Sequence, residues 1–253
     1  MTVEEIKEKY PYLYETHMHT SQASACGRST GKEMARALKD AGYTGTIVTD
    51  HNWGGNTCVD RNLPWKEWVD LFFAGYRDAK EEGDKIGLQV FPGWEAGYSG
   101  SEFLIYGLQP EFMAEHSELK EATPKEQYDL VHNAGGIVIQ AHPYREEWYI
   151  PEVRLFPDDV DGCEIVNATH SSHLSTAHND PEFDVRAIAY AKEHGFCTTA
   201  GSDVHSVNLF GGGIAFPSKL SSYEDFVNRI RNKEDYVITN GDHWYTRTGD
   251  LIV

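Results

Sequence analysis

The amino-acid sequence predicts a single α/β domain, residues 1–253, built around a closed or nearly closed barrel of parallel strands. The first observation is an alternation along the whole chain, where about six or seven short apolar runs are each followed by a helical pattern. The second is that nearly every expected strand ends in a His, Asp or Glu. In a parallel barrel the carboxyl ends of the strands meet on one face, so an active site is expected there.

The first half of the chain carries short strand-like runs and two long helical patterns. Thr30 and Glu33 form a capping box, in which the Thr side chain accepts from the backbone three residues on, and Gly42 suits the end of that helix. Trp68 and Phe72 belong to a second apolar stripe at helical spacing. We expect strands at 12–16, 44–49, 85–92 and 102–106, and helices at 30–41 and 64–82.

The second half repeats the alternation. Thr123 and Glu126 form another capping box, with Pro124 at the first helical position. The β-branched run 137–141 is typical of a strand that is buried on both faces. We expect strands at 137–141, 163–166, 196–200 and 236–239, and helices that begin near residues 123, 180 and 221.

Composition limits the classes of partner. The formal net charge is -18, without a run of Lys or Arg, so long nucleic acids are not expected to bind. The four cysteines show no C-x-x-C spacing, which favours free thiols in a reducing compartment. The first residues are charged and no apolar stretch is long enough to span a bilayer. We expect a cytoplasmic monomer or small homo-oligomer that does not bind membranes.

The candidate site consists of His, Asp and Glu side chains that follow expected strands. A single His in such a place is more often a hydrogen-bonded structural residue than a ligand. Alternate residues of a strand point to the same face, so the pairs in H-x-H and D-x-H converge. Seven N and O donors exceed what one tetrahedral zinc needs, and they suit two or three divalent ions of Mn, Fe or Zn. The set is His17, His19, His51, Glu95, His142, Asp203 and His205.

Four motifs in this order resemble those of the PHP (polymerase and histidinol phosphatase) superfamily of metal-dependent phosphoesterases. They are Glu-Thr-His17-Met-His19-Thr, Thr-Asp50-His51-Asn, Gln-Ala-His142-Pro-Tyr-Arg145 and Gly-Ser-Asp203-Val-His205. The resemblance covers about residues 14–213 and implies a distorted TIM-like (βα)7 barrel.

The resemblance also implies a role for each matched residue. His17, His19 and Asp203 would hold one metal, Glu95 would bridge to a second metal bound by His142, and His51 and His205 would hold a third. Asp50 is expected to orient a ligand imidazole. Arg145 could bind phosphate through its planar fork, which makes it a catalytic candidate with Glu95 and Asp203. The alternative for Arg145 is a surface ion pair with Glu146 or Glu147.

Two positions depart from the family pattern. Cys26 stands where many relatives carry a further His or Asp for the third metal, and its thiol could either ligate or only fill space. Gln109 stands at about the place where relatives with three metals have a His. Glu111 or His116 could supply that donor instead.

The expected function is hydrolysis of a small phosphorylated substrate by metal-activated hydroxide. A phosphomonoester such as histidinol phosphate, or a nucleoside or sugar phosphate, fits this expectation. Three alternatives remain open: amidohydrolase-type cleavage of a C–N bond, a polymerase-type nuclease, and a domain that binds metal without catalysis. Against the first, no Lys ends an expected strand, and against the second stands the acidic charge.

Overall fold

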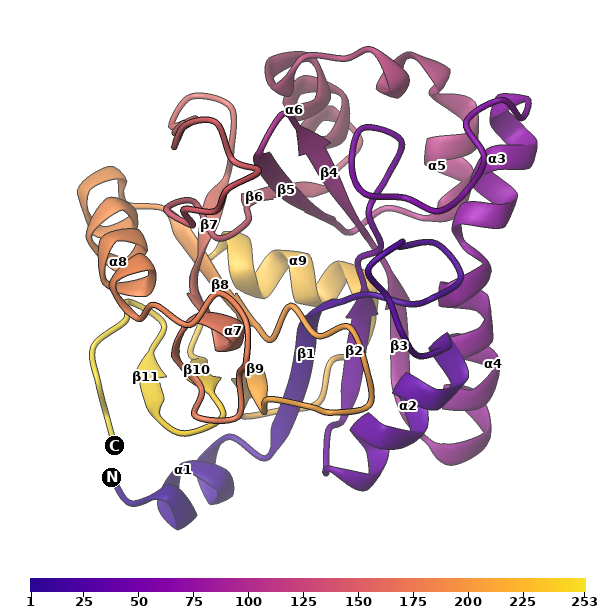
Figure 1. Cartoon of the computed structure of the whole chain (residues 1–253). Coiled ribbons are helices and arrows are strands. Elements are labelled where there is room, and N and C mark those ends of the chain that lie inside the picture. Colours follow the sequence, from indigo (N-terminus) through magenta and orange to yellow (C-terminus); the bar gives the residue numbers. More distant parts are fainter.

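The computed structural model describes residues 1–253 and places the strands in two sheets (Figure 1). The first sheet has the order β11-β10-β9-β1-β2-β3, and the second has the order β4-β5-β6-β7-β8. The first comprises β1 (Tyr12–Met18), β2 (Gly45–Val48), β3 (Gln89–Pro92), β9 (Gly212–Phe216), β10 (Val237–Asn240) and β11 (Trp244–Thr246). The second comprises β4 (Trp94–Tyr98), β5 (Ser101–Tyr106), β6 (Ile137–Gln140), β7 (Gly162–Asn167) and β8 (Cys197–Gly201).

The expected barrel of parallel strands is not found. Pairing is parallel within β1-β2-β3 and within β6-β7-β8. However, β5 runs antiparallel to β4 and β6, and β9 runs antiparallel to β1 and β10. The reversal between β4 and β5 is a tight turn at Ser99 and Gly100, both at positive φ, a backbone geometry suited to a two-residue hairpin.

Single bridges link the two sheets near the carboxyl ends of β1, β2 and β8 and the amino end of β4. Met18 of β1 pairs with Val204, which follows β8, and His51, which follows β2, pairs with Glu95 of β4. Both bridges are parallel. The polar residues that follow strands of different sheets are therefore brought to one place.

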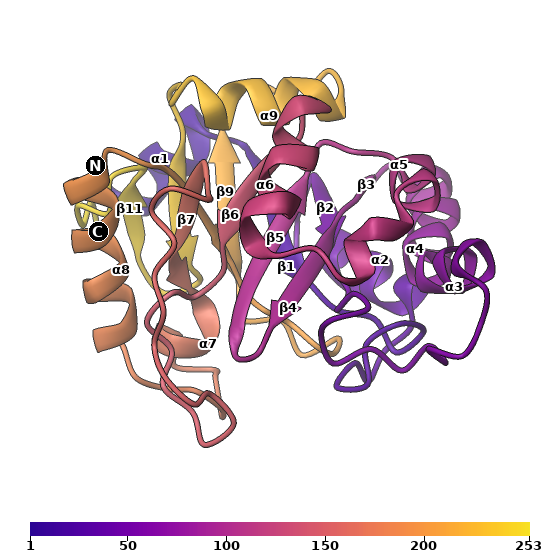
Figure 2. The ribbon, with the colours of Figure 1, turned by 90° about the horizontal axis from the view of Figure 1, so that it is seen from above.

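The helices cover the sheets from outside. In Figures 1 and 2, α2 and α4 lie beside β3, α8 lies at the opposite side of the molecule, and α9 crosses the end far from the long loops. They are α1 (Val3–Lys9), α2 (Gly31–Asp40), α3 (Trp65–Phe72), α4 (Ala74–Ile86), α5 (Pro110–Glu115), α6 (Pro124–Asn133), α7 (Ala168–Ser171), α8 (Glu182–His194) and α9 (Tyr223–Arg231), with a 3-10 turn at Ser117–Lys120. No helix is both long and apolar enough to cross a membrane.

Both predicted capping boxes form, at Thr30 and at Thr123. The expected helix 64–82 is wrong as a single element, because it breaks at Phe73 and then continues to Ile86. The strand expected from residue 85 consequently starts only at Gln89. The elements α1, α5, α7, β4, β9 and β11 were not predicted from the sequence.

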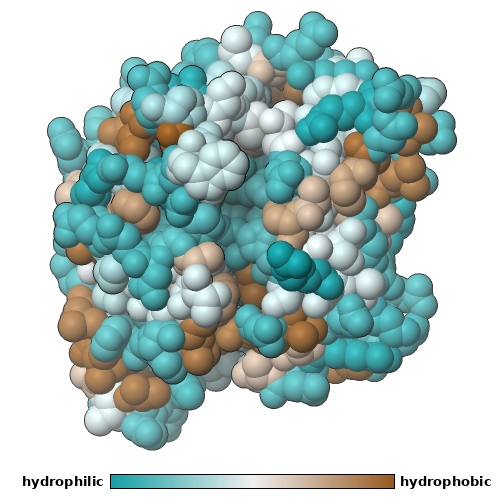
Figure 3. Space-filling model, in the orientation of Figure 1, coloured by the Kyte–Doolittle hydropathy of each residue, from teal (hydrophilic) through white to brown (hydrophobic).

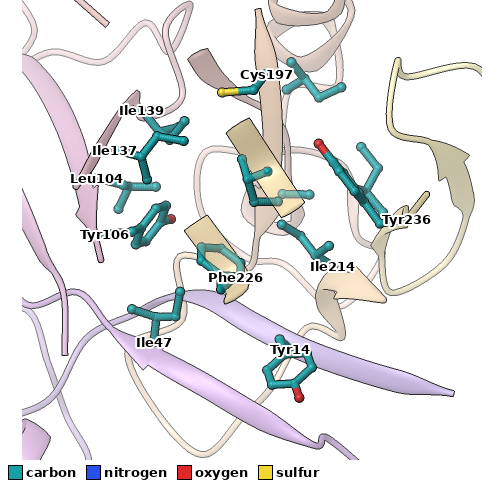
Figure 4. Packing of buried hydrophobic residues seen from close by; sticks show 14 of the residues in the cluster. Tyr14, Ile47, Leu104, Tyr106, Ile137, Ile139, Cys197, Ile214, Phe226 and Tyr236 are labelled. Carbon is teal, nitrogen blue, oxygen red and sulfur yellow. The ribbon is translucent and has the colours of Figure 1, made fainter. Parts of the chain in front are cut away.

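The main core lies between the two sheets and α9. Figure 4 shows Tyr106 of β5 and Phe226 of α9 together, and their ring centroids are 5.5 Å apart. Ile47 of β2 and Ile139 of β6 belong to the same buried cluster. This core fixes the strands from which the site residues project.

Candidate metal centre

All seven expected donors gather at the end of the sheets where the bridges lie, around a pocket of about 640 Å³. Figure 3 shows a hydrophilic hollow near the centre of the face seen in Figure 1. The pocket is lined by His51, Glu95, His142, Asp203 and His205, among others. His17 and His19 lie beneath these residues and are fully buried.

The two histidines of the H-x-H motif converge on Asp203. Nε2 of His17 lies 3.5 Å from Asp203 Oδ1, and Nε2 of His19 lies 3.2 Å from the same oxygen. The strand alternation expected from the sequence therefore produces a group of three donors that could hold one ion.

Glu95 lies at the middle of the cluster. Its Oε1 is 3.3 Å from Nε2 of His17 and 3.1 Å from Nε2 of His142. Its Oε2 is 2.9 Å from Nδ1 of His51 and 3.4 Å from Nε2 of His19. Burial alone would raise the pKa of this carboxyl group, but the imidazoles of His17 and His51 outweigh it and hold the pKa well below its usual range. A carboxylate with an imidazole pair on each oxygen has the geometry of a bridging ligand.

A third group of donors comprises His19, His51 and His205. The ring of His19 lies 4.4 Å from that of His51 and 4.5 Å from that of His205, centroid to centroid. Cys26 lines the pocket beside them. Burial opposes ionisation of its thiol, but contacts with His205 and His51 lower the pKa to about 7. Cys26 therefore lies beside this group of donors, and its role as a ligand stays a prediction.

Glu102 of β5 also lies at the site, although it is not among the donors predicted from the sequence. Its Oε1 lies 3.4 Å from Nδ1 of His51, and its Oε2 lies 3.6 Å from Nε2 of His142. Burial and the nearby Glu95 raise the pKa of Glu102 to about 7. The β4–β5 hairpin explains its position, because Glu102 pairs with Gly97, two residues beyond Glu95 and therefore on the same face. Recognition of the hairpin would have identified it.

Gln109 is not brought to the site. It is the exposed residue before α5, beyond the other end of β5. Glu111 and His116 do not line the pocket either, and His116 pairs with Glu118 on the surface. None of the three supplies a donor here.

Buried polar side chains orient the two histidines of the H-x-H motif. Nδ1 of His17 lies 3.0 Å from Glu164 Oε1, and Asn167 donates to the other oxygen of Glu164. Nδ1 of His19 lies 3.2 Å from Ser24 Oγ, whose hydroxyl donates to Asp50. Each Nδ1–H thus has an acceptor, which leaves each Nε2 free to bind a metal. Asp50 thus reaches the imidazole of His19 through Ser24 and not by direct contact.

Arg145 is buried and does not form the surface ion pair that was considered. Its Nη2 lies 2.8 Å from Asp203 Oδ2 and also donates to Thr169, while its Nε donates to His170. The surface interpretation is wrong because Glu146 pairs with Arg186 and Glu147 pairs with His178. Burial would raise the pKa of Asp203, but His17 and Arg145 outweigh this effect and lower it well below its ordinary value.

Two site residues hold an unusual backbone. Asp203 has φ 54° and His142 has φ 28°, both in the left-handed region that costs energy for residues other than Gly. Such strain persists only where the surroundings enforce it and is common at functional sites. This backbone conformation directs the side chains of Asp203 and His142 into the donor cluster.

The donor cluster fits divalent metal ions. His17 Nε2, His19 Nε2, His51 Nδ1 and Glu95 Oε2 are buried and have no hydrogen-bond partner in the protein. Buried polar atoms are rarely left unpaired, because each costs about 1–3 kcal/mol. These atoms point at one another across distances that a cation would bridge, and imidazole with carboxylate suits Zn, Mn and Fe.

Aromatic side chains stand at the mouth of the pocket. Trp148 is 92% exposed and Tyr149 is 45% exposed, and both line the pocket. Their ring centroids are 5.5 Å apart. Tyr98 and His178 line the same opening. The metal donors thus lie at the floor, and aromatic rings lie at the rim.

Several solved structures have a similar fold. A protein from Bifidobacterium adolescentis described as a metal-dependent phosphoesterase is 16% identical, with a TM-score of 0.53, over 87% of this chain and 96% of its own. A two-domain protein from Bacteroides vulgatus, described as containing a PHP-like metal-dependent phosphoesterase, is 14% identical, with a TM-score of 0.59, over 90% of this chain and 64% of its own.

An amidohydrolase from Chromobacterium violaceum with bound sulfate is 15% identical, with a TM-score of 0.53, over 76% of this chain and 87% of its own. No protein-family model matches the chain, and a comparison with curated proteins gives no match. At these identities the likeness concerns the fold, which the chain shares with proteins described as a metal-dependent phosphoesterase and as containing a PHP-like one.

Proposed function

We propose that this protein is a metal-dependent phosphoesterase that hydrolyses a small phosphate ester. The observation that carries the proposal is the position of Glu95 between four imidazoles, with Asp203 and Arg145 beside it in one pocket. His17, His19, His51, His142, Asp203 and His205 would hold two or three divalent ions together with Glu95. Bound there, the ions supply an activated water at neutral pH and neutralise phosphoryl oxygens.

The protein's own contribution to phosphate binding is Arg145. A guanidinium has five N–H donors, and those of Arg145 on Nε and Nη2 already contact His170, Thr169 and Asp203. Its Nη1 makes no hydrogen bond within the protein, so its two donors are free for phosphoryl oxygens. The contact with Asp203 holds the guanidinium next to the donor cluster, which would place the phosphate between Arg145 and the ions.

The pocket supports a small substrate. A volume of about 640 Å³ is in the range of small-molecule sites, and Arg145 is the only Lys or Arg among its lining residues. A long polyanion would require further cations along its path. The lack of Lys in the lining also disfavours an amidohydrolase that uses a carboxylated Lys as a ligand.

The test is release of inorganic phosphate from a panel of phosphomonoesters and small phosphodiesters by the purified protein. We expect turnover with Mn²⁺ that disappears in EDTA. Glu95→Gln keeps the size of the side chain and removes the charge, so it should abolish both metal retention and turnover. Glu118→Gln changes an exposed acid away from this pocket and is the matched control. Turnover that persists in Glu95→Gln would refute the proposed role of the site.

A further inference from the structure

We propose that Glu102 is a metal ligand and that it divides the centre into two chemically different ends. One end, with Glu95 and Glu102, is rich in oxygen and would take Mn²⁺. The other, with His19, His205 and Cys26, is rich in nitrogen and sulfur and would take Zn²⁺. This inference rests on the metal-binding part of the proposed function.

The oxygen-rich end is defined by two carboxylates that face the same imidazoles. Nδ1 of His51 lies 2.9 Å from Glu95 Oε2 and 3.4 Å from Glu102 Oε1. Nε2 of His142 lies 3.1 Å from Glu95 Oε1 and 3.6 Å from Glu102 Oε2. Both oxygens of Glu102 therefore point toward candidate ligands, and each lies slightly too far from its imidazole for a strong hydrogen bond.

The unpaired buried atoms at this end support a cation there. Nδ1 of His51 and Oε2 of Glu95 are inaccessible to solvent and have no hydrogen-bond partner. The side chains of His51 and Glu95 are 9% and 1% exposed, so water does not supply the missing hydrogen bonds. Two carboxylates beside unpaired imidazole nitrogens form a stable arrangement when a divalent ion lies between them.

The nitrogen-rich end has a different composition. His19 and His205 stack at 4.5 Å, and the Cys26 thiol contacts His205 and His51. His51 belongs to both groups and therefore lies at the boundary between the two ends. Imidazole and thiolate ligands favour Zn²⁺, whereas carboxylate ligands shift the preference toward Mn²⁺ and other hard ions. One pocket thus offers two sites of different softness.

The experiment measures metal content and needs no turnover. Metal-free protein is incubated with one equivalent of Zn²⁺ per chain and an excess of Mn²⁺, because Zn²⁺ binds most N and O sites more tightly than Mn²⁺. It is then freed of unbound ions and analysed by inductively coupled plasma mass spectrometry. Wild-type protein should retain both metals. Glu102→Gln should lose about one Mn²⁺ per chain and keep its Zn²⁺, because an amide is a weaker ligand than a carboxylate. Glu102→His should exchange that Mn²⁺ for Zn²⁺.

Two further variants complete the design. Cys26→Ser should lower Zn²⁺ content with Mn²⁺ unchanged, and Glu118→Gln should leave both unchanged. Circular dichroism checks that each variant is folded, and Glu102→His provides an independent reading if Glu102→Gln is not. Wild-type Mn²⁺ content in Glu102→Gln, or Zn²⁺ that does not rise in Glu102→His, would overturn the inference. Metal binding as described, without turnover of any ester, would refute the proposed function alone.

Discussion

The buried ion pair between Arg145 and Asp203 should be energetically coupled in the metal-free protein. Both side chains are 4% exposed, and Nη2 lies 2.8 Å from Oδ2. No other carboxylate lies within ion-pair distance of the guanidinium. Asp203→Asn removes the charge and keeps the shape, and Arg145→Met removes the charge and keeps most of the length.

The expected magnitude follows from burial. Removal of one partner of a buried ion pair leaves an uncompensated charge, at a cost of about 3–5 kcal/mol in the free energy of unfolding. Arg145→Met should lie at the lower end, since His17 and His19 still face Asp203. The double variant leaves no unpaired charge from this contact, so it should be destabilised by about 2–3 kcal/mol less than the sum of the single variants.

The assay is urea unfolding in EDTA, followed by circular dichroism, for the wild type, both single variants and the double variant. EDTA matters because a bound ion would add its own stabilisation. If the two substitutions are additive within about 0.5 kcal/mol, the contact is not energetically coupled and the reasoning fails.

Three further predictions concern single side chains. Because burial and Glu95 raise the pKa of Glu102 to about 7, above the ordinary 4.5, its ionisation should destabilise the metal-free fold as the pH rises from about 4 through 7. Glu102→Gln should therefore equal the wild type near pH 4 and exceed it by up to about 3 kcal/mol near pH 8 in urea unfolding; a pH-independent difference would contradict this. Ser24→Ala removes the acceptor of His19 Nδ1, so metal affinity measured by chelator competition should fall by about 10–100-fold. An unchanged affinity would show that the contact with Ser24 does not orient the imidazole of His19. Trp148→Ala should raise the KM for esters that carry a planar ring by about tenfold, because Trp148 could stack on that ring. The comparison is the KM for AMP, which has a planar ring, with the KM for ribose 5-phosphate, which has no planar ring. An equal effect on both would exclude stacking.

Local patterns in the sequence predicted the parts of the site that depend on local geometry. The alternation of a strand was enough to place His17 and His19 on one face, and the capping boxes at Thr30 and Thr123 begin helices as expected. The His and Asp residues after β1, β2, β6 and β8 meet because these strands end on the same side of the molecule.

The missed features have two different causes. The hairpin that carries Glu102 is local, and its turn at Ser99 and Gly100 is a turn signal that was not used in predicting the strands. The break at Phe73 is associated with a close approach, because a Cβ on Gly75 would lie 2.0 Å from Thr20 Oγ1. Thr20 in turn donates to Asp50. No periodicity within residues 64–82 reveals that neighbour.

The position of the donors on two sheets has a mechanical consequence. His17 belongs to β1 and His51 follows β2, whereas Glu95 and Glu102 belong to β4 and β5 of the other sheet. At this end the backbone joins the two sheets through two isolated bridges and through Gly93, the one residue between β3 and β4. An ion held by His51 and Glu95 would therefore act as a cross-link between the sheets, and its binding free energy would oppose their separation. Metal supply would then set how cooperatively the two halves of the protein unfold, in addition to any effect on catalysis.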